Sequence, residues 1–127
     1  MVKKFTRPQM ESPCEHRESG DVVTQFPFTD LSGSRVRPAV VVSRGRIIDD
    51  IVLAGISSVI RGTSSPTDYV VAMTHPEFRL TGLRVVSVLR MHKLAAVECS
   101  VIIRRLGRLG PRLQAEADRL LRAVLGL

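Results

Sequence analysis

The chain has 127 residues and a mass of 14.0 kDa, about the size of one domain. Its apolar fraction of 44% is typical of a folded protein and argues against a disordered chain or a fibre. No apolar run approaches the roughly 18–20 residues that cross a bilayer, and the charged N-terminus leads into no apolar segment of a secretory signal. We therefore expect a soluble, cytoplasmic single domain with no membrane contact.

The positive charge is concentrated in one part of the chain. The formal net charge is +7, and residues 1–78 hold nine basic and nine acidic residues, whereas residues 79–127 hold ten basic and three acidic ones. Sixteen of the 19 basic residues are Arg, whose planar fork suits phosphate. This asymmetry indicates a polyanionic partner, either nucleic acid or an acidic protein segment, although a biased genome composition also explains an Arg-rich chain. With four Phe, one Tyr and no Trp, a base-stacking platform is not expected.

The cysteines and histidines predict no metal site. Cys14 and Cys99 are too few for a disulfide-built scaffold, and no Cys-x-x-Cys pair is present. His16 lies two residues from Cys14, but no further ligands stand close by. We expect neither a metal nor another cofactor.

The first half of the chain predicts short strands. Residues 1–19, with mixed charges and two prolines, are expected to form a poorly ordered extension before a domain over residues 20–127. A β-type segment follows at 22–28, interrupted by Pro27, and then a loop at 29–34. The β-branched run at 38–43 is too short for a helix and predicts a strand buried on both faces.

The second half continues this pattern and ends in a helix. Strands are expected at 51–58, where Gly55 indicates a bulge or a close backbone approach, and at 69–73, 85–91 and 100–104. Pro111 suits a first helical position and Gly126 a C-terminal cap. One apolar stripe at helical period lies between them, formed by Leu113, Ala117, Leu120, Leu121, Val124 and Leu125. The fold class predicted is mainly β, a small twisted antiparallel barrel with a C-terminal α-helix.

Several segments carry motifs in a fixed order along the chain. In residues 20–43, Gly20-Asp21 opens a strand, a Gly-containing loop follows, and Arg37-Pro38 precedes an aliphatic strand. Together with 54–58, 88–94 and 101–109, this order resembles the MazF/PemK-like toxins of type II toxin–antitoxin systems over roughly residues 20–127. It implies an SH3-like barrel, also seen in the gyrase poison CcdB, and a homodimer neutralised by a cognate antitoxin whose acidic, partly disordered segment covers the RNA groove.

The resemblance also implies an activity. The family's best-studied members are endoribonucleases that cut single-stranded RNA without a metal, with the 2′-hydroxyl as nucleophile, leaving a 2′,3′-cyclic phosphate and a 5′-hydroxyl. Arg37 aligns with the family's catalytic Arg, and its guanidinium can bind two phosphate oxygens at once. Pro38 restrains the backbone of Arg37 to an extended conformation. Without the resemblance, Arg37 would be interpreted as a surface residue flanking a strand.

A hydroxyl residue, usually Thr, pairs with that Arg in the family, and Ser57 aligns with it. Ser57 keeps the hydroxyl donor but lacks the methyl group that restrains the Thr rotamer. Ser58 is the alternative if the alignment is shifted by one residue. The simpler interpretation is that Ser57 ends a strand with a turn-forming hydroxyl.

Arg90 and His92 are spaced so that both side chains leave one face of a strand, with Met91 on the other. One branch of the family carries an Arg and an Asp at this spacing, proposed as acid and base. His92 replaces the Asp here, and its imidazole titrates near neutrality. We expect His92 to transfer protons or to be an inert replacement, and Arg90 to contact phosphate.

Further binding residues are implied in two places. In relatives, the loop after the first strand gates the RNA groove, and here it contains Thr29, Asp30, Ser32, Ser34 and Arg35. Arg104, Arg105 and Arg108 either follow backbone phosphates or form a solvated basic strand edge. Two other functions stay open: a non-enzymatic gyrase inhibitor on the same barrel, and a degenerate barrel that binds RNA or antitoxin without cutting.

Overall fold

The computed structural model describes residues 17–25, 36–44, 48–60 and 65–127. Six strands lie along these residues: β1 (Asp21–Gln25), β2 (Arg37–Val41), β3 (Asp50–Ser57), β4 (Asp68–Val71), β5 (Ser87–Glu98) and β6 (Ile102–Arg108). A short helix α1 (Phe78–Thr81) precedes β5, a 3-10 turn η2 (Cys99–Val101) joins β5 to β6, and α2 (Pro111–Leu125) ends the chain.

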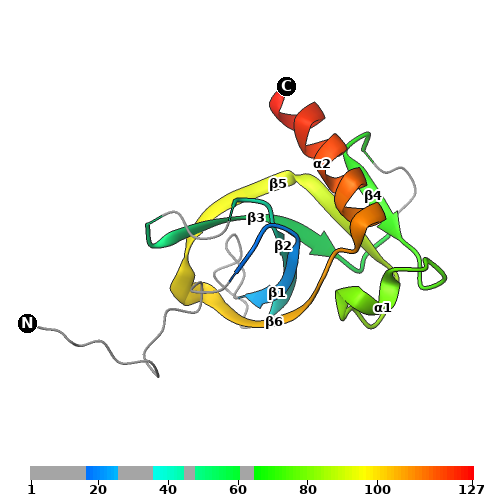
Figure 1. The fold of residues 1–127 in the computed structure, drawn as a ribbon, viewed down its shortest axis with the longest axis horizontal. Coiled ribbons are helices and arrows are strands. Elements are labelled where there is room, and N and C mark those ends of the chain that lie inside the picture. The colour runs from blue at the N-terminus through cyan, green and yellow to red at the C-terminus, as the bar shows by residue number, and fades with distance from the viewer. Residues whose placement is uncertain (1–16, 26–35, 45–47, 61–64) are drawn as a thin grey trace, which may run out of the picture.

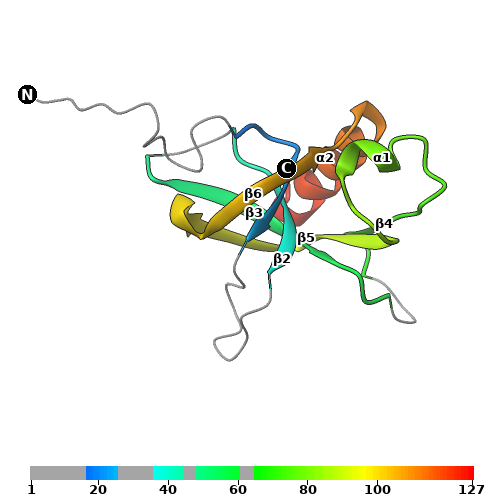
Figure 2. The same cartoon turned by 90° about the horizontal axis from the view of Figure 1, so that it is seen from below.

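The six strands form one antiparallel sheet in the order β4-β5-β3-β2-β1-β6. Figures 1 and 2 show this sheet curling around itself, with α2 packed across one side and α1 beside the end of β6. The mainly β fold with a C-terminal helix is therefore confirmed. Of the predicted N-terminal extension, residues 1–16 lie outside the described residues, while the carbonyl of Glu18 accepts the N–H of Asp21 at the start of β1.

The central strands are buried on both faces, as the β-branched run predicts. In β2, Val40 belongs to one apolar cluster, whereas Ala39 and Val41 belong to a second. Neighbouring positions of β1 divide in the same way, with Val22 in the first cluster and Val23 in the second. Alternate side chains of a strand point to opposite faces, so continuous apolar runs are needed where both faces pack.

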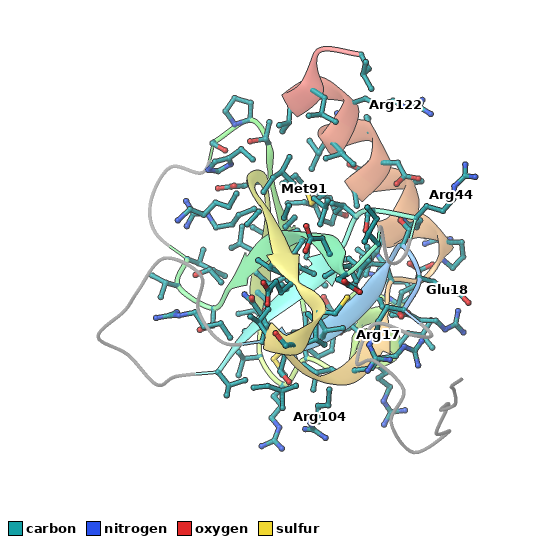
Figure 3. The ribbon with its side chains drawn as sticks, turned by 90° about the vertical axis from the view of Figure 1, so that its left-hand side faces the viewer. Arg17, Glu18, Arg44, Met91, Arg104 and Arg122 are labelled. Atoms are coloured by element: carbon teal, nitrogen blue, oxygen red, sulfur yellow. The ribbon has the colours of Figure 1, made fainter. Side chains whose placement is uncertain are left out.

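Helix α2 forms where the apolar stripe predicts it. Leu113, Ala117 and Leu120 are buried, and they join the first cluster under the helix. Gly126 ends the helix at a φ of 74°, in the left-handed conformation that suits glycine. Figure 3 shows Met91 of β5 inside the molecule, while Arg104 and Arg122 project from its surface.

The first turn of α2 is capped from outside the helix. Gly110 at the N-cap offers no side chain, and the Glu77 carboxylate instead accepts the N–H groups of Arg112 and Leu113 at 2.9 and 2.8 Å. Burial raises the pKa of the Glu77 carboxyl. The two N–H donors and the nearby charges of His75 and Arg112 lower this pKa by more than burial raises it, so it lies below its ordinary value. Glu77 thus ties the segment before α1 to α2.

Strand boundaries differ from the sequence prediction mainly in β5 and β6. The predicted strand at 85–91 extends to Glu98, and the predicted strand at 100–104 begins at Ile102 and reaches Arg108. The second half of β5 has no fully buried residue, so the alternation of buried and exposed positions that marks a strand is weak there, and pairing with β3 makes it a strand. The bulge predicted at Gly55 is confirmed, because the β3–β5 register shifts between Ala54 and Gly55.

Helix α1 was not predicted from the sequence, and it is held against β6 by close backbone approaches. A Cβ built on Gly82 would lie 2.2 Å from the carbonyl oxygen of Leu106, and one built on Gly107 would lie 2.2 Å from that of Leu80. The Thr81 hydroxyl donates to the carbonyl of Phe78 at 2.6 Å and accepts the N–H of Leu83 at 3.1 Å. These contacts hold the α1–β5 connection beside β6.

Candidate functional site

The start of β2 and the end of β3 lie side by side. Ala39 pairs with Gly55 in antiparallel register, and Gln25 of β1 pairs with Arg37 on the other side of β2. Arg37 lies two residues before Ala39, and Ser57 lies two residues after Gly55. Both line one cleft. The strand pairing therefore brings together two residues that are 20 positions apart in the chain.

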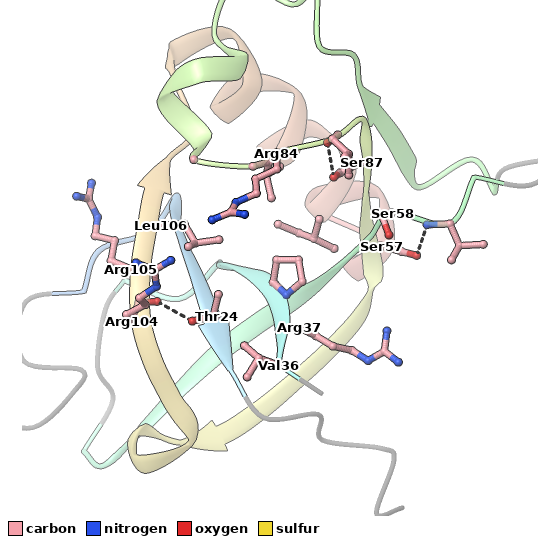
Figure 4. Close-up of a pocket in the computed structure, with 16 residues that line it drawn as sticks. Thr24, Val36, Arg37, Ser57, Ser58, Arg84, Ser87, Arg104, Arg105 and Leu106 are labelled. Carbon is pink, nitrogen blue, oxygen red and sulfur yellow. Dashed lines mark hydrogen bonds between the residues drawn. The ribbon is translucent and has the colours of Figure 1, made fainter. Parts of the chain in front are cut away.

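The cleft has a volume of about 720 Å³, and four arginines line it among the described residues: Arg37, Arg84, Arg104 and Arg105. Figure 4 shows its lining, which comes from β1, β2, β3, β6 and the α1–β5 connection. None of the described residues that line it is acidic. The other described residues that line it are Thr24, Val36, Pro38, Ile56, Ser57, Ser58, Val59, Gly82, Leu83, Val85, Ser87 and Leu106. A concave surface lined by several arginines and by no described acidic residue is suited to an anionic ligand.

The Ser57 hydroxyl is oriented by the backbone that follows it. Its Oγ accepts the N–H of Val59 at 3.0 Å (Figure 4), and the residue is half-buried. This is the turn-forming bond that the simpler interpretation of Ser57 expects. The bond uses the oxygen as acceptor, so the hydroxyl proton is still able to donate to a ligand in the cleft. Ser58 also lines the cleft and is exposed.

Arg37 and Arg84 carry their charges without a partner among the described residues. Both are exposed, and neither has an ion pair or a side-chain hydrogen bond within the part of the chain that the structure describes. Arg105 differs, because its Nε lies 3.0 Å from Oδ1 of Asp21. The cleft guanidinium groups that no described carboxylate contacts are the ones suited to binding an anion with two nitrogens.

Arg84 is a cleft residue that the sequence did not predict. It stands in the segment Gly82-Leu83-Arg84-Val85, which shows no motif and no periodicity. Only the excess of basic residues after position 78 gave any signal for it. Its place at the cleft depends on the contacts of α1 with β6, which local patterns do not reveal.

The three arginines of β6 separate in the structure. Arg104 and Arg105 line the cleft, whereas Arg108 lines a second, smaller hollow with Arg17 and Glu18, which Arg105 also borders. Thr24 of β1 donates its hydroxyl to the carbonyl of Arg104 at 3.5 Å, across the β1–β6 pair. Arg104 therefore shares the cleft with Arg37 without an ion pair among the described residues, whereas Arg105 is paired with Asp21.

Arg90 and His92 share one face of β5 as predicted, with Met91 completely buried on the other. Both contact Asp68 of β4: Arg90 Nε lies 3.8 Å and His92 Nδ1 lies 3.6 Å from its Oδ1. The same His92 nitrogen is 3.0 Å from the Thr67 hydroxyl. Neither residue lines the Arg37 cleft, so the structure does not bring this pair together with Arg37 and Ser57.

The other predicted binding residues, Thr29, Asp30, Ser32, Ser34 and Arg35, lie outside the described residues. Among the residues that the structure does describe, no group of three or more His, Cys, Asp or Glu side chains is arranged to hold a metal ion. No helix in those same ranges has the length and apolar character to span a membrane.

Comparison with known proteins identifies the family. The profile of the PemK-like, MazF-like toxins of type II toxin–antitoxin systems matches residues 18–125. The match spans most of the chain, so the protein belongs to this family of toxins. No curated protein sequence matches it.

Solved structures of low sequence identity have the same fold. An endoribonuclease from a mycobacterial species, solved in complex with its cognate antitoxin, aligns with a TM-score of 0.66 at 19% identity, covering 87% of this chain and 96% of that one. A MazE–MazF complex from Deinococcus radiodurans aligns with a TM-score of 0.64 at 22% identity, covering 87% of this chain and 97% of that one. At these identities, the likeness shows the fold alone.

Proposed function

We propose that this toxin is an endoribonuclease that cuts single-stranded RNA in the Arg37 cleft. The observation that carries the proposal is the lining of this cleft, in which the described residues include four arginines and no acidic residue. Arg37 and Ser57 both belong to that lining. A similar fold occurs in mycobacterial proteins described as endoribonucleases. Family membership adds that the activity serves a toxin–antitoxin system.

The proposed reaction uses the RNA as its own nucleophile. The 2′-hydroxyl attacks the adjacent phosphorus and loses its proton, and the bond to the 5′-oxygen breaks as that oxygen takes up a proton. The products are a 2′,3′-cyclic phosphate and a 5′-hydroxyl. Negative charge grows on the non-bridging phosphate oxygens during attack, so donors fixed at those oxygens accelerate the reaction.

Arg37 and Ser57 are suited to that electrostatic task. The planar Arg37 guanidinium can donate to two phosphate oxygens at once. Ser57, with its oxygen held by the N–H of Val59, can donate its proton to one of them. None of the described lining residues is a His, Asp or Glu, so our proposal rests on charge stabilisation in the cleft and gives His92 no part in it.

The partners follow from the same surface. The positive cleft suits an acidic, partly disordered segment of a cognate antitoxin, which would compete with RNA for the same arginines.

A homodimer is the expected assembly, since a domain of this size gains burial by association. Light scattering should then report roughly twice the chain mass of 14.0 kDa.

The test is incubation of the purified protein with a single-stranded RNA pool of random sequence in excess EDTA. We expect the parent to cut it and to leave 5′-hydroxyl ends, and we expect Arg37→Ala to lower the rate by about 10²–10³-fold, the cost typical of a lost transition-state donor. Arg119→Ala is the matched control, because Arg119 is an exposed arginine of α2 that pairs with Glu116 and lies away from the cleft.

Two results would contradict the proposal. Full activity of a folded Arg37→Ala variant would remove the site from this cleft. Absence of cleavage by the folded parent, across the whole pool, would remove the nuclease activity, and a supercoiling assay with DNA gyrase would then test the inhibitor function.

A further inference from the structure

Arg84 occupies the α1–β5 connection and reaches the cleft from a different element than Arg37. It is one of the cleft's lining residues, its side chain is exposed, and it lies two residues after the close contact of Gly82 with Leu106. Figure 4 shows Arg84 extending into the cleft from this connection, while Arg37 extends from the start of β2.

The backbone on both sides of Arg84 is fixed. Before it, Leu83 donates its N–H to the Thr81 hydroxyl at 3.1 Å, and its side chain packs against the first apolar cluster. After it, the Ser87 hydroxyl donates to the carbonyl of Val85 at 2.9 Å. A residue whose neighbours are anchored loses little backbone entropy on binding, because its backbone is already ordered.

Arg84, like Arg37, has no ion pair among the described residues, whereas two other arginines do. Arg90 and Arg105 each lie near a buried carboxylate, Asp68 or Asp21. Arg84 has no acidic partner within the described residues and shares its cleft with three further arginines. Like charges placed together destabilise a folded protein, so such a cluster indicates an anionic ligand that neutralises it.

We propose that Arg84 is a phosphate-binding residue of the cleft and that it holds the RNA strand next to the phosphate bound by Arg37. The inference rests on the proposed RNA cleavage. A single strand presents a phosphate at every nucleotide, so a strand whose reacting phosphate lies at Arg37 brings further phosphates into the same cleft. Arg90, beside Asp68, is less available for this contact.

The experiment measures binding of a non-cleavable 2′-O-methyl RNA pool by fluorescence anisotropy at several salt concentrations. Arg84→Ala is expected to weaken binding about tenfold and to make the slope of log affinity against log salt shallower by about 0.7, the value for one phosphate contact to a single strand. Arg84→Lys keeps the charge and should keep most of the slope.

The matched control is Arg79→Ala. Arg79 is an exposed arginine five residues earlier, on α1, and it does not line the cleft. Its substitution removes the same charge from the same part of the chain, so we expect almost no change in the salt slope. If the salt slope becomes shallower by the same amount for both variants, the two arginines act only through the general positive potential of the surface, and the proposed Arg84–phosphate contact is overturned.

Other outcomes separate this inference from the proposed function. If the parent cuts RNA, Arg37→Ala does not, and Arg84→Ala binds with the parent's affinity and slope, only the Arg84 contact is refuted. If Arg84→Ala instead weakens binding of a poly-glutamate peptide and leaves the RNA slope unchanged, Arg84 serves an acidic protein partner and the proposal is overturned. If the parent neither binds nor cuts RNA, both proposals fail.

Discussion

The carboxylate of Glu77 accepts the N–H of Leu113 at 2.8 Å, and so joins the segment before α1 to the first turn of α2. A second bond, from the N–H of Arg112 at 2.9 Å, completes the cap. Helix N-termini carry unpaired N–H groups and a partial positive charge, and a carboxylate satisfies both. The same segment leads through α1 to Arg84, so the cap also belongs to the structure that builds the cleft.

Replacing Glu77 with Gln should lower the free energy of unfolding in a pH-dependent way. The folded-state pKa of Glu77 lies below its ordinary 4.5, so its charge stabilises the fold above that pH and this contribution is lost as the pH falls through the folded-state pKa. Denaturant unfolding between about pH 3 and pH 7 measures this. The difference between parent and Glu77→Gln should be largest near neutrality and shrink in acid; a difference that is constant over the range would contradict the assignment.

Gly82→Ala should destabilise the protein and move the α1–β5 connection. Gly82 has a φ of 74°, and a Cβ there would lie 2.2 Å from the carbonyl oxygen of Leu106. Gly126 is a matched control, because it has the same φ of 74° and a Cβ added there would meet nothing within 4 Å. Gly126→Ala should therefore incur only the left-handed backbone penalty of about 1 kcal/mol, and Gly82→Ala clearly more. Thermal unfolding of both variants compares them, and equal losses would refute the close approach.

Ser57→Ala should reduce RNA cleavage by roughly 10–100-fold, because it removes one donor to the phosphate and keeps the strand. Ser57→Thr restores the hydroxyl and should restore most of the rate. Ser58→Ala is the control from the same cleft, and kcat and KM on one RNA substrate distinguish the three variants. If Ser58→Ala carries the loss and Ser57→Ala does not, the active hydroxyl belongs to Ser58.

Local patterns were sufficient for the elements whose signal is contained in a few neighbouring residues. The 3.6-residue spacing of Leu113, Ala117 and Leu120 predicted α2, because a helix repeats its buried face at that period. The continuous β-branched run around Val40 predicted a strand buried on both faces. Register then placed Arg37 and Ser57 in one cleft, as the family resemblance implied for residues 20 positions apart.

Only the tertiary structure decided which cations share that cleft. Arg84 lies in it where Gly82 and Gly107 let α1 approach β6 closely, whereas Arg90 and His92 do not line it and contact Asp68 of β4 instead. A side chain's partners depend on strand pairing and loop docking over long sequence distances, whereas periodicity reports only which face of an element is buried. The sequence by itself determined the family, the helix and the doubly buried strands, and the packing of distant segments determined the composition of the cationic cleft.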